Sequence, residues 1–360
     1  MKALFGVVVL VLSGCGDQES PVTSPAPVST TLAPQVGQTS APKSYQWSRQ
    51  DGARLFTETF AALNGSFHAL NSNSDESPCP PFHFSVRGEE VSIHTPIFQT
   101  PDSVIYRSDT GQYAVKTVAA DVGIMALGWR ESAALSVLDR AKKTAAPKIL
   151  ESSISGACGL RTIVSDFVGE TSLADIVPGS LGTEEVNRLG IALLSLLEEV
   201  HSIGLVHGDM HAGNVVTNGS EVKLIDFGRA RVFIDPVSGQ HIPFTYSDEE
   251  LDFNPMLLSL HELEGWMPSR RDDLFRLAEL LAFLVDGDEC LYIHRTIRGR
   301  RVTLIPPQRE IIKRKRFRIF SSQVPAGVVQ LYNAATVMAF DQDPDYESLR
   351  ALFPDDANPV

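Results

Sequence analysis

The sequence predicts an α+β protein of two lobes, a small antiparallel-sheet lobe followed by a larger helical lobe. From Phe82 to Ala119, short apolar or alternating runs are broken by turn residues, a pattern typical of strands. Farther along, apolar residues recur at helical spacing, most regularly between Glu184 and Ile203. The chain has 360 residues, of which 43% are hydrophobic, so it can build a sizeable core.

The first residues have the features of a cleaved secretory signal. A lysine precedes the apolar run 3–12, which is too short to span a bilayer and is followed by small residues. We therefore expect residues 1–15 to be a signal peptide and the protein to be secreted or to lie in an endomembrane lumen. The alternative is lipid attachment at Cys15, because Leu-Ser-Gly-Cys at 12–15 resembles a bacterial lipoprotein box.

The segment that follows is expected to be a spacer. Residues 16–45 are rich in serine, threonine and proline and poor in large apolar side chains. Such a segment cannot bury enough apolar surface to offset its ordering entropy, so we expect it to be disordered. Apolar residues at helical spacing within 45–70 then predict an extra helix packed on the first lobe. The first lobe is expected at 46–168 and the helical lobe at 169–355.

Composition limits the classes of partner. A formal charge of −13 argues against general affinity for nucleic acid or anionic membranes. No apolar run is long enough to predict a transmembrane segment. Cys79, Cys158 and Cys290 follow no metal or redox spacing, and they are compatible with one disulfide or with three buried thiols.

The most informative pattern lies between Leu205 and Arg231. Asp209 and Asn214 fall in a polar loop, and Asp226 follows the next apolar strand. Phosphoryl transfer needs a carboxylate beside the incoming hydroxyl and oxygen ligands for magnesium on the nucleotide phosphates. These three side chains can supply both, whereas the alternative is that they are ordinary solvated turn residues.

The order and spacing of these residues resemble the catalytic loop and the metal-binding Asp-Phe-Gly of protein kinases. The resemblance implies a two-lobed kinase-like fold with ATP and Mg²⁺ as cofactors. It further implies that His207 is structural, that Asp209 orients the attacking hydroxyl and accepts its proton, and that Asn214 and Asp226 bind the metal.

A second resemblance to kinases lies in the predicted sheet. Lys116 ends the strand motif Tyr-Ala-Val-Lys, and Glu131 lies in the helical run that follows. A buried lysine would be costly without a partner. The resemblance implies that Lys116, paired with Glu131, holds the α- and β-phosphates, so the implied catalytic residues are Asp209, Lys116 and Glu131. The nucleotide contacts that it implies are Lys116, Ser103, Ile105, Ala114, Asp166, Val168, Asn214 and Asp226, with Ser165 as a small gatekeeper.

The chain departs from the kinase pattern at three places. The glycines of the phosphate-covering GxGxxG loop are replaced by Phe98, Thr100 and Ser103, which is expected to weaken nucleotide binding. Gly208 replaces an arginine that in many kinases pairs with a phosphorylated activation loop, so such activation is not expected. His211 replaces a lysine, and HGDxHxxN with this histidine also occurs in small-molecule phosphotransferases such as aminoglycoside and choline kinases.

Segments of the second half resemble the casein kinase 1 family. The matching residues are Gln240-His-Ile-Pro-Phe244, Ser269-Arg-Arg-Asp-Asp-Leu274 and the closing stretch Phe340 to Phe353. With the earlier motifs, they cover about Ile105 to Phe353. The resemblance implies a serine/threonine protein kinase that transfers the ATP γ-phosphate to hydroxyls of a protein substrate. It also implies that Asp273 hydrogen-bonds the catalytic-loop backbone.

Substrate preference and activity stay open at this point. Phe253 and Met256 stand where the family has glycine and arginine, so a preference for primed, phosphorylated substrates does not carry over. A basic run within 295–318 is interpreted as a solvated charged face, with a replacement anion site as the alternative. A kinase-shaped binding module without activity is the second hypothesis, and a small-molecule phosphotransferase is the third. A long separation between Lys116 and Glu131 would favour the binding module.

Overall fold

The computed structural model describes residues 47–70, 83–86, 89–99, 103–119, 122–155, 160–246, 254–287, 293–297, 300–304 and 306–354. The expected signal peptide, the whole expected spacer, all four cysteines, Thr100 and Phe253 lie outside these residues. The inferences drawn from them stay predictions. None of the described helices is both long enough and apolar enough to cross a membrane.

The first part of the fold is a six-stranded antiparallel sheet in the order β1-β2-β3-β4-β6-β5. The strands are β1 (His83–Val86), β2 (Glu89–Gln99), β3 (Ser103–Ser108), β4 (Tyr113–Ala119), β5 (Ile149–Ser155) and β6 (Leu160–Asp166). The turn between β3 and β4 is closed by a hydrogen bond from the N–H of Gly111 to Ser108 O at 2.8 Å. Gly111 has φ +72°, a conformation that glycine adopts without strain.

The two faces of the sheet have different environments. Val115 on β4 and Val164 on β6 pair in register and are fully buried in a small apolar cluster on one face. Lys116 and Ile163 pair in register one position farther along, so they point to the other face. Helix α2 (Val122–Arg140) packs on the sheet and contributes to the cluster that contains Ile163. Alternation along β4 therefore directs Lys116 toward the same side as α2.

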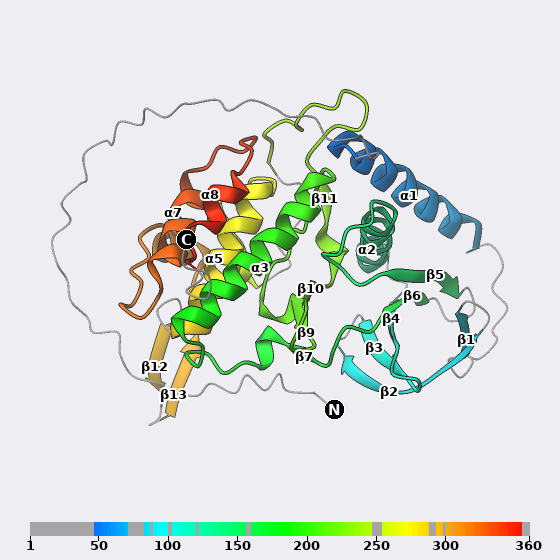
Figure 1. The fold of residues 1–360 in the computed structure, drawn as a ribbon, viewed down its shortest axis with the longest axis horizontal. Helices are drawn as coiled ribbons and strands as arrows, with labels where there is room; N and C mark the ends of the chain where they lie inside the picture. The colour runs from blue at the N-terminus through cyan, green and yellow to red at the C-terminus, as the bar shows by residue number, and fades with distance from the viewer. Residues whose placement is uncertain are drawn as a thin grey trace.

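The extra helix predicted within 45–70 forms as α1 (Arg49–Leu70) and contacts both parts of the fold. Its Phe60 ring packs edge-on against Trp129 of α2 at 6.3 Å between centroids. Its first turns pack on the large lobe, where Ala53 is buried with Val206 and Phe233. In Figure 1, α1 lies beside α2 on the side away from the sheet. The helix therefore connects the two lobes rather than covering the first lobe alone.

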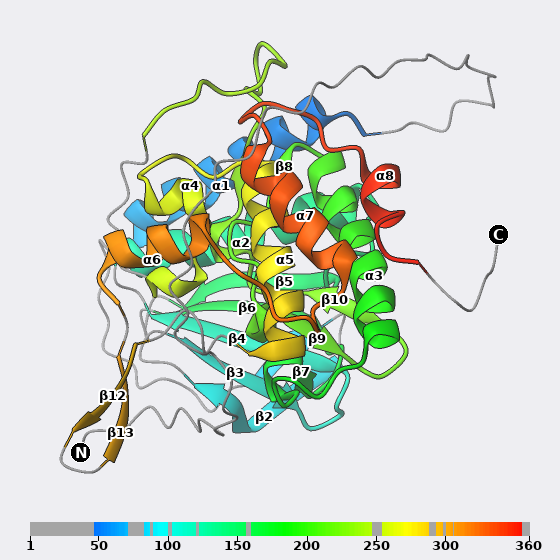
Figure 2. The ribbon, with the colours of Figure 1, turned by 90° about the vertical axis from the view of Figure 1, so that its left-hand side faces the viewer.

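The large lobe is mostly helical (Figures 1 and 2). Its helices are α3 (Thr183–Ser202), α4 (Leu260–Leu263), α5 (Arg270–Asp286), α6 (Gln308–Arg316), α7 (Ala326–Val337) and α8 (Tyr346–Arg350). Its short strands are β7 (Thr171–Ser172), β8 (Leu205–Val206), β9 (Val215–Thr217), β10 (Val222–Leu224), β11 (Arg231–Val232), β12 (Ile293–Ile297) and β13 (Arg300–Leu304). The 3₁₀ turns are η1 (Leu173–Asp175), η2 (Ala212–Asn214), η3 (Phe227–Arg229) and η4 (Pro255–Leu257).

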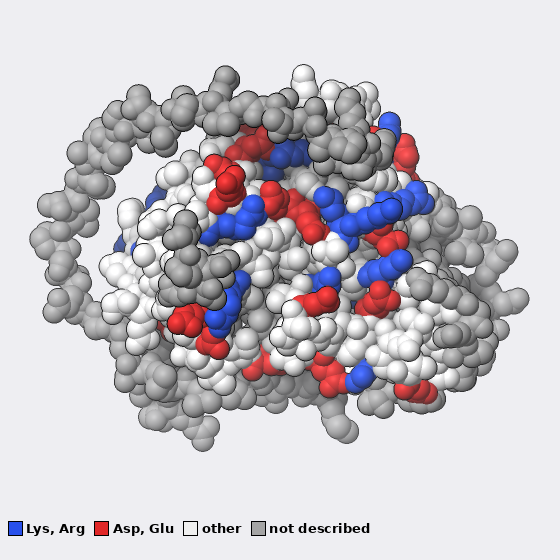
Figure 3. Space-filling model, viewed as in Figure 1, with Lys and Arg blue, Asp and Glu red and all other residues white. Residues whose placement is uncertain are grey.

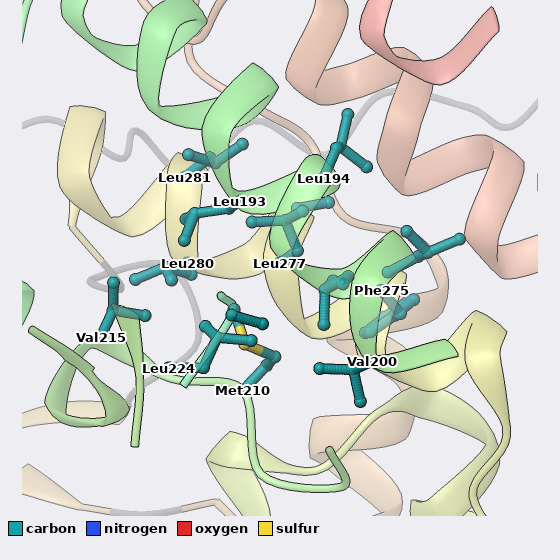
Figure 4. Close-up of a cluster of buried hydrophobic side chains, with 14 of the residues drawn as sticks. Leu193, Leu194, Val200, Met210, Val215, Leu224, Phe275, Leu277, Leu280 and Leu281 are labelled. Carbon is teal, nitrogen blue, oxygen red and sulfur yellow. The ribbon is translucent and has the colours of Figure 1, made fainter. Parts of the chain in front are cut away.

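The core of the large lobe lies between α3, α5 and the strands that flank the catalytic loop. Figure 4 shows Leu193 and Leu194 of α3 meeting Leu277 and Leu281 of α5, with Met210 of the loop packed beneath them. All five side chains are at most 2% exposed. Truncating such a leucine to alanine typically costs about 2–5 kcal/mol, so this core is what holds the loop between β8 and β9 against the helices.

The basic run within 295–318 differs from the solvated face that was expected. Lys315 on α6 is fully buried, and its ammonium donates to Met256 O at 2.9 Å, to Leu258 O at 2.8 Å and to Glu279. Arg318 also pairs with Glu279, at 3.3 Å. Basic and acidic side chains are interspersed on the face of the molecule that Figure 3 shows. Part of the run is therefore buried, where Lys315 binds the carbonyl oxygens of the segment before α4.

Gly52 is where α1 meets the large lobe most closely, and we expect Gly52→Val to destabilise the protein by about 1–3 kcal/mol. A Cβ at this position would lie 1.9 Å from the carbonyl oxygen of Ile203, so the helix or the turn after α3 has to move. Urea unfolding measures the effect. The matched control is Glu58→Val on the exposed face of α1, which should change stability by less than about 0.5 kcal/mol. Equal losses in both variants would contradict the proposed contact.

Candidate active site

Strand register brings most of the predicted nucleotide-binding residues of the sheet to one face. Ile105 of β3 lies opposite Lys116 of β4, and Ala114 lies opposite Ser165 of β6. Because directly paired residues and residues two apart point the same way, these four side chains share a face. Ser103 begins β3 two residues before Ile105 and belongs to the same face.

Lys116 forms the central ion pair of the site. Its ammonium lies 2.8 Å from Glu131 Oε2 on α2 and 3.0 Å from Asp226 Oδ1 after β10. Burial alone would lower the pKa of Lys116, but the charges of Asp226 and Glu131 outweigh it and raise the pKa above its ordinary value. Lys116 is therefore a fixed cation that joins the sheet to α2 and to the segment after β10.

Asp226 sits at a strained position of the backbone. It has φ +59° and caps η3, where its Oδ1 also accepts the N–H of Gly228 at 3.3 Å. Non-glycine residues adopt this left-handed conformation at an energetic cost, and such residues cluster at functional sites. The next residue, Phe227, is fully buried and packs on the His207 ring at 4.5 Å between centroids. The buried phenylalanine anchors the turn that presents the carboxylate.

The catalytic-loop residues lie side by side. The Asn214 side-chain nitrogen donates to Asp209 O at 2.9 Å and to Asp209 Oδ2 at 3.2 Å. These bonds fix the Asn214 amide, so that its oxygen is the atom it can offer to a cation. Asp226 uses Oδ1 for Lys116 and Gly228, which leaves Oδ2 on a side chain that is 44% exposed.

These two residues fit a magnesium ion bound together with a nucleotide. Magnesium usually takes one or two protein carboxylates and obtains its other oxygen ligands from substrate phosphates and water. Asn214 and Asp226 provide a carboxylate and an amide in adjoining segments, and Lys116 supplies positive charge between them and α2. The donor set is therefore suited to a hard cation bound to phosphates.

The loop is held from below by Asp273, as the casein kinase 1 resemblance implied. Asp273 accepts the N–H groups of His207 at 2.7 Å and of Gly208 at 2.9 Å. It also pairs with His201 Nε2 at 2.9 Å. Burial would raise the pKa of Asp273, but the hydrogen bond from His201 and the neighbouring groups lower it, so the carboxylate is charged. His207 donates from Nε2 to Ile225 O at 3.1 Å, which ties the loop to β10.

Two arginines near Asp209 were not identified from the sequence. Arg229 Nη1 lies 3.7 Å and Arg276 Nη1 lies 3.6 Å from Asp209 Oδ1. His211 Nε2 is 3.8 Å from the other carboxylate oxygen, and its Nδ1 accepts the N–H of Gly213 at 3.1 Å. The sequence signal that could have identified Arg276 is its charge within the apolar run of α5. Its position three residues after Asp273 places both on one helix face.

The remaining predicted nucleotide-binding residues follow the sheet. The N–H of Asp166 donates to Lys148 O at 3.0 Å, and the segment then continues past the half-buried Val168 into the large lobe. Phe98, at the position of a missing loop glycine, is the last residue but one of β2 and is 58% exposed. The structure therefore brings Lys116, Glu131 and Asp226 together with the loop pair, and it places Ser103, Ile105 and Ala114 on the sheet face of Lys116. Asp166 pairs with Tyr113 and points to the opposite face.

Comparison with known proteins agrees with this geometry, although no protein-family model matches the sequence. Casein kinase 1-like protein HD16 of Oryza sativa subsp. japonica is 30% identical over 213 residues, which are 53% of this chain and 27% of the relative. Casein kinase I homolog 1 of Schizosaccharomyces pombe is 26% identical over 55% of this chain and 46% of the relative. Over about half of its length the chain is therefore similar to casein kinase 1 proteins.

A solved structure shows the same fold. Vaccinia related kinase 3 aligns with a TM-score of 0.59 at 18% identity, covering 81% of the casein kinase 1-like chain and 94% of the solved chain. The predicted two-lobed α+β kinase fold is confirmed. The casein kinase 1-like chain spans less than half the length of the two sequence relatives.

Buried histidines under the loop should make the casein kinase 1-like chain sensitive to mild acid. Burial lowers the pKa of His201 and of His207, so both are neutral in the folded state. The unfolded chain binds their protons below about pH 6.5, so the unfolding free energy should fall as pH drops from that value. We expect His201→Asn to reduce this slope by up to about 1.4 kcal/mol per pH unit, measured by urea unfolding between pH 7.5 and 5.5. An unchanged slope would contradict the neutral, buried His201.

Proposed function

We propose that this casein kinase 1-like chain is a serine/threonine protein kinase that uses ATP and Mg²⁺. The observation that carries the proposal is the triad of Lys116, Glu131 and Asp226, with both carboxylates within 3.0 Å of one ammonium. This is the arrangement that holds nucleotide phosphates and their metal in kinases. The sequence relatives, a casein kinase 1-like protein and a casein kinase I homolog, support the same activity.

The binding-module hypothesis is less well supported by the geometry. It would gain from a Lys116 separated from Glu131, but the two are in hydrogen-bonding distance. Its remaining support is the glycine-free phosphate loop and the exchange of a lysine for His211. Neither change removes a carboxylate, the amide or the ammonium from the site.

Each side chain has a defined task in the proposed reaction. ATP would supply the phosphoryl group, and Asn214 and Asp226 would hold the Mg²⁺ that neutralises charge on the phosphates. Lys116 holds the α- and β-phosphates and is kept in place by Glu131. Asp209 accepts a hydrogen bond from the substrate hydroxyl and takes its proton as the oxygen attacks phosphorus and ADP leaves. Most of the rate enhancement then comes from positioning and charge.

The proposed substrate is a protein with serine or threonine hydroxyls. We propose that the chain phosphorylates it outside the cytosol. The location rests on the predicted signal peptide at residues 1–15, and lipid attachment at Cys15 is its alternative. No preference for primed substrates is proposed, because Met256 is a buried apolar residue of η4 where the family has arginine. A small-molecule phosphotransferase remains the third candidate, favoured only by HGDxHxxN.

Asp209→Asn should reduce phosphate transfer by about 10²–10⁴-fold, because an amide cannot accept the hydroxyl proton. The assay is magnesium-dependent transfer from ATP to casein by the full chain, with choline and an aminoglycoside as competing acceptors. Asp109→Asn, in the exposed turn between β3 and β4, is the control and should transfer at the unchanged rate.

The outcomes separate the three candidates. Transfer to casein that is lost in Asp209→Asn supports the protein kinase. Transfer to choline or the aminoglycoside alone would replace it with the small-molecule enzyme. No transfer to any acceptor, with weak nucleotide binding in both forms, would leave a kinase-shaped binding module.

A further inference from the structure

Arg276 of α5 lies beneath the catalytic loop and contacts it directly. Its Nη1 donates to the carbonyl oxygen of Gly208 and lies 3.6 Å from Asp209 Oδ1. The rest of the guanidinium binds Glu262 of α4, with Nε at 3.0 Å from Oε2 and Nη2 at 2.6 Å from Oε1. Arg276 is 2% and Glu262 is 5% exposed, so the whole arrangement is dry.

Arg276 and Asp273 bind opposite ends of the same loop residue. Asp273 accepts the N–H of Gly208 at 2.9 Å, and Arg276 donates to its carbonyl oxygen. The two side chains are three residues apart on α5 and therefore lie on one helix face. The donor and the acceptor of Gly208 are both fixed by one rigid helix, and the next residue in the chain is Asp209.

Glu262 determines the direction of the Arg276 guanidinium. Two parallel N–H···O bonds to a carboxylate fix the plane of a guanidinium as well as its distance. Glu262 is itself held, because its Oε2 accepts the N–H of Ser259 at 2.9 Å and its own N–H donates to Ser259 Oγ at 3.2 Å. This capping box ties the carboxylate to the first turn of α4.

We propose that Arg276 is a positioning residue for catalysis, which sets the orientation of Asp209 and ties it through Glu262 to helix α4. The proposal rests on the proposed kinase function. Arg276 does not contact substrate, because it is buried and fully engaged, whereas Arg229 on the other side of Asp209 is 15% exposed at its side chain. A buried ion pair often contributes little net stability compared with apolar residues of similar size. Stability and catalysis can therefore be separated by experiment.

The test uses a single and a double substitution in the full chain. Arg276→Met leaves Glu262 buried without its partner and should lower the unfolding temperature. Arg276→Met with Glu262→Met removes both charges and should return the unfolding temperature to near that of the wild type. In this double variant kcat should still be about 100-fold lower, with the dissociation constant for ATP changed by less than about twofold, because only the loop is displaced.

The matched control removes the ion pair of another buried arginine of the same helix. Arg270 is 1% exposed and binds Asp343 and the carbonyl oxygen of Asp341. Arg270→Met with Asp343→Leu should leave kcat unchanged. Arg276→Lys keeps the charge but cannot form the two parallel bonds, so its kcat should lie between those of the wild type and the double variant.

Amide hydrogen exchange of residues 205–214 gives a readout that does not depend on activity. Exchange should be faster in the Arg276/Glu262 double variant and unchanged in the Arg270/Asp343 control. Wild-type exchange and wild-type kcat in the stable double variant would overturn the proposal. A wild-type chain that transfers no phosphate, but whose loop exchanges faster in the double variant, would refute the proposed function and retain the positioning role.

Discussion

The large lobe depends on the pairing of charges along one buried helix. From Arg270 to Val285, every residue of α5 except Phe283 is buried, and six of these residues are charged. An unpaired buried charge costs several kcal/mol, so the surrounding segments have to supply partners. In Figure 1, α5 lies between α3 and α7, and it contacts both. The partners are Asp343 for Arg270, the carbonyl oxygen of Met338 for Arg271, Ser259 for Asp272, His201 and the loop for Asp273, Glu262 for Arg276, and Lys315 and Arg318 for Glu279.

This pairing fixes the positions of segments that are distant in the sequence. Lys315 of α6 joins Glu279 of α5 to the carbonyl groups before α4, and Glu262 of α4 returns to α5 through Arg276. The catalytic loop is bound to the same helix through Asp273. A functional site is held most precisely when its supporting side chains belong to rigid elements. The catalytic loop, α4 and α6 are therefore all positioned by α5. A shift of α5 would move all three segments and so change the geometry of the site.

The sequence predicted those parts of the site that local spacing determines. Asp209, Asn214 and Asp226 lie within one short stretch, and Lys116 and Glu131 lie in consecutive elements, so their order alone indicated the constellation. The helix that became α3 was predicted because its apolar residues repeat at helical spacing over several turns. Its observed bounds, Thr183–Ser202, are close to the expected 184–203.

Long-range pairing could not be predicted in the same way. A charged stretch is normally solvated, yet Lys315 is fully buried because Glu279 of another helix meets it. The Arg276–Glu262 pair joins two helices across an intervening loop, and no periodicity relates them. Helix α1 was expected on the first lobe, but Gly52 allows it to approach Ile203 of the large lobe. These contacts form only in the assembled fold, and the spacing of residues along the chain does not indicate them.

Gly208 shows how the altered loop and its supports depend on one another. Its φ of +75° favours glycine, and a Cβ would lie 2.5 Å from the carbonyl oxygen of Arg229, so a larger residue would displace the Asp226–Arg229 turn. The position that carries an arginine in many kinases thus cannot carry one in this packing. Positive charge reaches Asp209 instead from Arg229 beside it and from Arg276 below it. Both arginines are placed by folding, and Arg276 is already paired, so we expect the loop to be ordered without a phosphorylated activation segment.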